Sequence, residues 1–185
     1  MNLQQKKDNS FLATEPLGKL LLKLSLPTVT AQIINMLYNI VDRIYIGHIP
    51  ENGALALTGV GVCMPLIMIV SAFAALVGNG GAPRASIFMG KGDKESAERT
   101  LGNCFTTQII VSLLLTIILF TGNRSFLMAF GASENTIPYA VAYMNIYSLG
   151  TIFVQLTLGM NAFITAQGFA RTGMLSVLVL SLIHI

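Results

Sequence analysis

A long apolar segment with one polar seam, residues 20–46, constrains this sequence more than any other feature. As a helix it would be roughly 40 Å long, enough to cross a hydrocarbon core of ~30 Å. Its polar side chains alternate at intervals of four and three residues, which places them on one helix face: Thr28, Gln32, Asn35, Asn39 and Asp42. Because a polar stripe is unfavourable in lipid, we expect it to face other helices or a water-filled cavity.

The overall composition also indicates a membrane protein. Hydrophobic residues make up 54% of the chain and charged residues only 10%, whereas soluble domains carry about 25% charged residues. We therefore predict an all-α integral membrane protein, with four complete transmembrane helices and the start of a fifth. The expected helices cover about residues 20–46, 54–77, 101–120, 138–166 and 173 onward.

Asp42 is the acidic residue that stands out, because no other lies in an apolar segment. A carboxylate at membrane depth costs ~2.5–3.5 kcal/mol, so it is a functional candidate. Asn39 and Asn35 share its face and could hydrogen-bond a carboxylate or bind an ion, which favours a proton or sodium site. The alternative is that Asp42 reaches interfacial water at the outer end of its helix. Pro27, in the same helix, removes a backbone hydrogen bond and predicts a kink.

Other polar residues in the apolar segments have a structural interpretation beside a functional one. A row at intervals of four is expected to form hydrogen bonds between helices: Gln108, Ser112 and Thr116. Tyr147 and Gln155 lie deeper in the fourth segment than the tyrosines that would anchor its end. They could line a cavity instead of anchoring the helix end at the membrane interface, and the sequence favours neither alternative.

The segment 78–100 is interpreted as a glycine-rich loop. It lacks the spacing of a phosphate-binding loop and follows no strand, so that function is excluded. Residues 93–99 resemble the start of an amphipathic helix on the membrane surface, and residues 121–136 are interpreted as a second loop.

Catalytic chemistry finds no support in the sequence. There is no nucleophile–base pair and no metal-ligand spacing. Cys63 and Cys104 belong to no CxxC motif and are expected to be small core residues. We therefore expect no enzyme activity and no cofactor. The net charge of +3 follows topology and does not indicate nucleic-acid binding.

The basic residues predict the orientation. With residues 1–19 as a cytoplasmic tail, nine of the 11 Lys and Arg residues fall inside, and only Arg43 and Arg124 lie outside. Basic loops stay in the cytoplasm, so the N-terminus is expected there.

Several blocks together resemble the multidrug and toxic compound extrusion (MATE) family, especially its MepA-like bacterial branch. The resemblance covers about residues 17–178. The blocks are Leu-Pro-Thr at 26–28, Leu-Tyr-Asn-Ile-Val-Asp-Arg-Ile-Tyr-Ile-Gly-His at 37–48, Gly-Ala-Leu-Ala-Leu-Thr-Gly-Val-Gly-Val at 53–62, Gly-Lys-Gly-Asp-Lys at 90–94, Gly-Ala-Ser at 131–133 and Leu-Gly-Met-Asn-Ala-Phe-Ile-Thr-Ala-Gln-Gly at 158–168.

This resemblance implies a bacterial inner-membrane antiporter with twelve helices in two six-helix bundles. Such proteins export small cationic, amphipathic drugs, driven by inward flow of protons or sodium. The resemblance assigns cation coupling to the position of Asp42 and helix bending to that of Pro27. We expect Asn39 and Asn35 to assist the coupling, and Gln32, Thr28, Tyr147 and Gln155 to line the substrate cavity.

The sequence departs from the family at its end. It stops within the fifth helix, before the Asn-x-x-x-Asp-Pro motif of relatives, and residues 179–185 do not resemble family sequence. We expect residues 20–178 to be part of the N-terminal bundle of a transporter whose C-terminal half is missing, through a truncated gene or a sequencing junction. Two alternatives remain: a lipid-precursor or polysaccharide flippase of the same superfamily, and a membrane fragment that does not transport.

Overall fold

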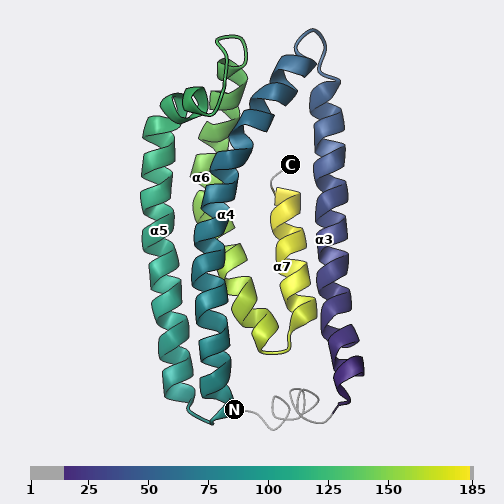
Figure 1. The fold of residues 1–185 in the computed structure, drawn as a ribbon, viewed down its shortest axis with the longest axis vertical. Helices are drawn as coiled ribbons and strands as arrows, with labels where there is room; N and C mark the ends of the chain where they lie inside the picture. The colour runs from purple at the N-terminus through teal and green to yellow at the C-terminus, as the bar shows by residue number, and fades with distance from the viewer. Residues whose placement is uncertain (1–14, 184–185) are drawn as a thin grey trace.

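The computed structural model describes residues 15–183. Most of the expected cytoplasmic tail, and the last two residues of the chain, lie outside this range. The described part folds into five helices (Figure 1), whose bounds are α3 (Leu17–Gly47), α4 (Gly53–Gly90), α5 (Lys94–Ala129), α6 (Ile137–Ala166) and α7 (Ala170–Ile183). The described residues contain no strand. Four of the helices are long and apolar enough to cross a membrane, which confirms the all-α membrane fold.

Two predicted loops are largely helical. Helix α4 continues to Gly90 and α5 begins at Lys94, so the loop expected at 78–100 was wrong and only residues 91–93 form a turn. Helix α5 also continues to Ala129, which leaves residues 130–136 of the second expected loop as a turn.

The glycines in α4 explain the first difference, because they allow close packing instead of ending the helix. A Cβ atom on Gly78 would come within 2.7 Å of the backbone oxygen of Gly159 on α6. A Cβ atom on Gly81 would overlap the Cys104 sulfur and the Phe163 ring. Small residues that let backbones approach are the usual basis of helix packing in membranes, and this packing offsets the intrinsic helix penalty of glycine, which is about 1 kcal/mol per residue.

The start of α5 is fixed by a helix cap. Asp93 precedes the first turn, and its Oδ1 accepts a hydrogen bond of 3.0 Å from the Ser96 backbone amide. Hydrogen bonds from the Ser96 side chain and backbone, and the nearby Lys91 charge, lower the pKa of Asp93. The segment expected to be a separate surface helix is therefore the first two turns of the spanning helix α5.

Helices α4, α5 and α6 pack as a three-helix unit, and Gln108 lies at its centre. The Gln108 side chain is fully buried, and its Nε2 donates to the backbone oxygens of Ala74 on α4 (3.3 Å) and Gln155 on α6 (3.2 Å). This confirms the predicted interhelical role of Gln108. Ser112 instead bonds within its own helix, to the Ile109 oxygen at 2.8 Å.

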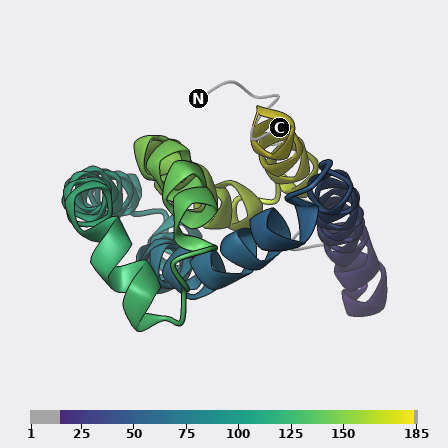
Figure 2. The same cartoon turned by 90° about the horizontal axis from the view of Figure 1, so that it is seen from above.

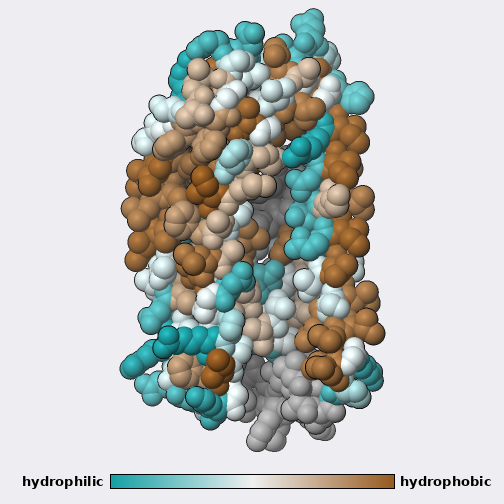
Figure 3. All heavy atoms as spheres, viewed as in Figure 1, coloured by the Kyte–Doolittle hydropathy of each residue, from teal (hydrophilic) through white to brown (hydrophobic). Residues whose placement is uncertain are grey.

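Helices α3 and α7 form a second layer beside this unit. Seen from above, α7 lies between α3 and the C-terminal end of α6, on the side away from α5 (Figure 2). In α3 only Ala31 is buried, and large apolar side chains around the helix are exposed. The space-filling view shows a hollow between α3 and α4, with hydrophilic residues along its α3 edge (Figure 3).

Candidate functional site

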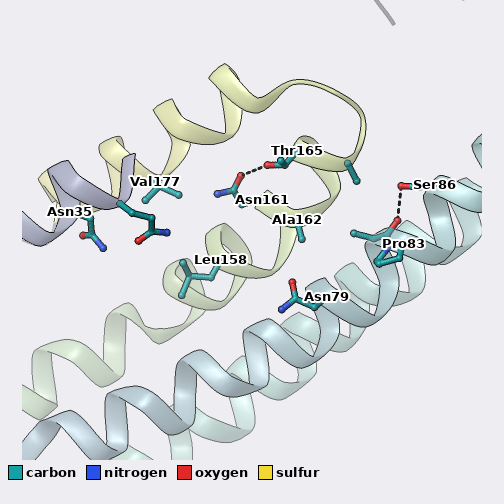
Figure 4. Close-up of a pocket in the computed structure, with 12 residues that line it drawn as sticks. Asn35, Asn79, Pro83, Ser86, Leu158, Asn161, Ala162, Thr165 and Val177 are labelled. Carbon is teal, nitrogen blue, oxygen red and sulfur yellow. Dashed lines mark hydrogen bonds between the residues drawn. The ribbon is translucent and has the colours of Figure 1, made fainter. Parts of the chain in front are cut away.

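A cavity of about 750 Å³ lies between the two layers, and it takes residues from four helices. Helix α3 contributes Gln32 and Asn35, α7 contributes Val177, and the rest comes from α4 and α6 (Figure 4). The residues from α4 and α6 are Asn79, Ala82, Pro83, Ser86, Leu158, Asn161, Ala162, Thr165 and Ala166.

Neutral amides are the main polar groups of this wall. Asn79 and Asn161 face the space from α4 and α6, opposite the α3 residues (Figure 4). The Thr165 hydroxyl donates to Asn161 Oδ1 at 3.4 Å, and the Ser86 hydroxyl donates to the Ala82 oxygen at 3.0 Å. Because an amide offers both donors and acceptors, the wall can hydrogen-bond a small molecule without imposing a charge.

Close packing of α7 against α6 closes one side of the cavity. A Cβ atom on Gly173 would overlap Asn161 Oδ1 and come within 3.0 Å of the Thr165 hydroxyl. Only glycine allows α7 to approach the polar wall this closely.

The sequence contained a signal for the wall residues that the prediction missed. Asn79, Pro83 and Ser86 repeat the four-and-three spacing of the α3 stripe, and Asn161 and Thr165 are one turn apart. The assignment of residues 78–100 to a loop hid the first set. The second set lies among apolar residues without a longer polar repeat.

Asp42 lies outside the cavity, near the C-terminal end of α3. It is seven residues from Asn35, or about 10 Å along the helix. It is half-buried and interacts electrostatically with Tyr38 on its own helix and with Tyr143 on α6. Arg43 points toward α4, with its Nη2 at 3.7 Å from Met64 Sδ. Within residues 15–183, Asp42 forms no ion pair.

Two other members of the stripe bond to their own helix. The Asn39 Nδ2 donates to the Asn35 oxygen at 2.8 Å, and the Thr28 hydroxyl donates to the Leu24 oxygen at 3.1 Å. Neither side chain lines the cavity. Pro27 lies inside α3, as expected, and its role in bending stays a prediction.

Tyr147 and Gln155 lie inside the three-helix unit. Tyr147 is 8% exposed and packs in the apolar core, while Gln155 is fully buried and its Nε2 donates to the Val70 oxygen at 2.7 Å. The structure therefore places both inside the packed helix unit, away from the cavity wall, which the sequence did not predict. In the described part of the chain, no three His, Cys, Asp or Glu side chains could together hold a metal ion.

Comparison with known proteins identifies the family. The sequence model of MatE matches residues 27–185. This chain belongs to the MatE family. The resemblance seen in the sequence blocks is thereby confirmed, and with four apolar helices the chain is a multi-pass membrane protein.

Two relatives of this MatE chain have informative names. This chain is 24% identical over 161 residues to the multidrug export protein MepA of Staphylococcus haemolyticus. The matched region covers 85% of this chain and 35% of that relative. The chain is 25% identical over 167 residues to a FAD transporter of Shewanella oneidensis, which covers 90% and 35%. This chain thus spans about a third of the length of these relatives.

A solved structure named only protein A has the same fold. It superposes on the MatE chain with a TM-score of 0.83 at 32% identity, over 91% of this chain and 37% of that one.

Proposed function

We propose that this chain forms one wall of the substrate cavity in a cation-coupled exporter of small, cationic, amphipathic compounds. The cavity between α3 and the three-helix unit carries the proposal. Its volume of about 750 Å³ is within the ~300–1,000 Å³ typical of small-molecule sites. Apolar residues and a few amides make up its lining, as expected of a site that accepts compounds of varied shape.

Coupling is assigned to Asp42. Binding of a proton or a sodium ion there removes a negative charge from the helix that carries the cavity wall. A cationic substrate is bound less well after that change, so ion and substrate exclude each other, which is the linkage an antiporter needs. For a sodium ion, the side-chain oxygen of Asn39, about one turn from Asp42, would add a hard ligand, whereas Asn35 lies in the cavity wall.

The cavity lining bears on the charge of the substrate. None of its twelve residues is charged, and Asp42 is the acidic residue of α3; a negative charge near the cavity favours cations. A compound with phosphate groups, such as FAD, finds no basic side chain in this lining. The same observation disfavours the alternative of a flippase for anionic lipid precursors.

We also propose a bacterial plasma membrane location with the N-terminus in the cytoplasm. The helices alternate in direction (Figure 1), so the start of α3, the turn between α4 and α5, and the start of α7 share one end. Seven of the nine basic residues in the described range lie toward that end: Lys19, Lys23, Arg84, Lys91, Lys94, Arg99 and Arg171. Such an excess is typical of the cytoplasmic side.

Export of a fluorescent cationic dye from cells tests the function, measured with the intact transporter that carries this chain. Asp42→Asn keeps the shape of the side chain but cannot ionise, so we expect export and its dependence on pH or sodium to be lost at normal expression. Glu51→Gln, in the exposed turn after α3, is the matched control and should export at the parental rate. Parental export by Asp42→Asn, with its ion dependence intact, would contradict the proposal.

A further inference from the structure

A second groove lies between α4 and α5. It shares no lining residue with the cavity between the two layers. It has a volume of about 590 Å³ and lies toward the end where the basic residues gather. Its charged lining residues are Arg84 on α4 and Arg99 on α5, and no acidic residue lines it. The groove therefore brings two positive charges from neighbouring helices to one place.

The lengths of the two helices set the depth of these arginines. Helix α4 has 38 residues and is about 57 Å long, far more than the ~30 Å hydrocarbon core. Arg84 is six residues before the end of α4, or about 9 Å, and Arg99 is five residues after the start of α5, or about 8 Å. With the two helices centred on the hydrocarbon core, both side chains lie at the level of lipid headgroups.

The two guanidinium groups are available to an anion. Arg84 lies over the Phe88 ring, at 5.8 Å from its centroid, and forms no ion pair within the described range. Arg99 pairs with Glu95 at 3.4 Å, but the two side chains are 78% and 83% exposed. An ion pair this exposed is weak and easily exchanged for a better partner.

The hydroxyl groups of the groove contribute little as donors. Thr100 donates to the Ser96 oxygen and Thr107 to the Asn103 oxygen, each at 2.8 Å. The Ser96 hydroxyl is hydrogen-bonded to Asp93, so the main donors left for an anion are the two guanidiniums and the Asn103 amide. Paired guanidiniums match the geometry of a phosphate group, which they can bind through two hydrogen bonds each.

The groove is apolar toward the middle of the bilayer. Leu76 lines it there and is 70% exposed, and Phe73, one turn farther along α4, is 40% exposed. A ligand with a phosphate at the arginines would have this apolar strip directly beside it.

We propose that this groove binds an acidic glycerophospholipid. Its phosphate contacts Arg84 and Arg99, and an acyl chain follows Leu76 and Phe73 along α4. Basic pockets between transmembrane helices are the usual sites for acidic headgroups. A free phosphate ion would make no contact with the apolar strip. A zwitterionic lipid would bring the positive charge of its headgroup close to the two arginines.

Native mass spectrometry of the detergent-solubilised chain tests the proposal by titration with phosphatidylglycerol or with phosphatidylcholine of the same acyl chains. We expect one saturable phosphatidylglycerol and weaker binding of phosphatidylcholine. Arg84→Gln and Arg99→Gln should each weaken the phosphatidylglycerol complex about tenfold, as for loss of one charge-assisted contact. Arg84→Lys keeps the charge but loses the paired geometry, and should weaken it less.

Arg171→Gln is the matched control, because Arg171 is an exposed arginine at the same end of the molecule and does not line the groove. It should bind phosphatidylglycerol as the parent does. The proposal is overturned if Arg171→Gln weakens binding as much as Arg84→Gln, or if both lipids bind equally. It is also overturned if millimolar inorganic phosphate displaces the lipid completely, since the anion alone would then account for the site.

Discussion

The three-helix unit and helix α3 differ in how they are held in place. In the most apolar part of α4 and α6, 28% of residues are buried, and 22% in α5, against 6% in α3. The unit is joined by side-chain hydrogen bonds between helices and by close glycine contacts. Helix α3 packs mainly on α7 and only slightly on α4.

This difference in packing indicates where movement can occur around the cavity. Elements with few buried contacts have the lowest cost of local rearrangement. The cavity has one wall on the closely packed unit, against which α7 also packs through Gly173, and the other on the loosely packed helix α3. For the exporter proposed above, whose cavity would have to open to each side of the membrane in turn, we expect helix α3 to be the part of this chain that moves.

The largest expected effect comes from the centre of the unit. Gln108→Ala removes two interhelical hydrogen bonds and leaves a buried void, so we expect a loss of about 3 kcal/mol in unfolding free energy. Gln108→Met keeps the volume and should lose only about 1 kcal/mol. Gln32→Ala, in exposed α3, should change the unfolding free energy by less than about 0.5 kcal/mol. Unfolding in detergent checks this, and equal losses for Gln108→Ala and Gln32→Ala would contradict the comparison.

A smaller effect is expected from one methyl group between α4 and α6. Gly78→Ala would place a Cβ atom 2.7 Å from the Gly159 oxygen, and separating the two backbones should cost about 2 kcal/mol. Gly80→Ala is its control on the same helix, since no atom lies within 4 Å of a Cβ atom there. That change should be neutral or stabilising by up to about 1 kcal/mol. Thermal unfolding of the two variants gives the answer, and the opposite order would show that the contact is not tight.

The smallest effect is expected at the exposed cap of α5. The folded pKa of Asp93 is lowered, first by the Ser96 side chain and then by the Ser96 backbone amide. A lowered folded pKa means that the cap stabilises α5 at pH values above the unfolded pKa of the aspartate. That stabilisation is lost as the pH falls through the lowered folded value. In Asp93→Ala this part of the acid dependence should be absent, as measured by helix content against pH, and an unchanged acid profile would contradict the cap.

Sequence patterns predicted the apolar spans and the polar face of α3 because both depend on periodicity alone. They failed for residues 78–100, because glycine and proline usually mark a loop. The structure keeps α4 helical there through contacts with α6, such as that of Gly78 with Gly159. Those contacts join residues far apart in the chain, so no local pattern contains them. For the same reason the sequence did not show that Gln155 packs between helices, where its Nε2 reaches the Val70 oxygen of α4.

Distances between pairs of spin labels, measured in lipid on the exporter proposed above, test most directly whether α3 moves relative to the three-helix unit. Ile33 on α3, Ile117 on α5 and Phe153 on α6 suit cysteine labelling, because they are 54%, 60% and 65% exposed. The free Cys63 and Cys104 are first replaced by alanine. We expect a narrow distribution of Ile117–Phe153 distances that a cationic substrate leaves unchanged, and an Ile33–Phe153 distance that shifts when the substrate is added. A fixed Ile33–Phe153 distance, or a shift of the Ile117–Phe153 distance, would contradict it.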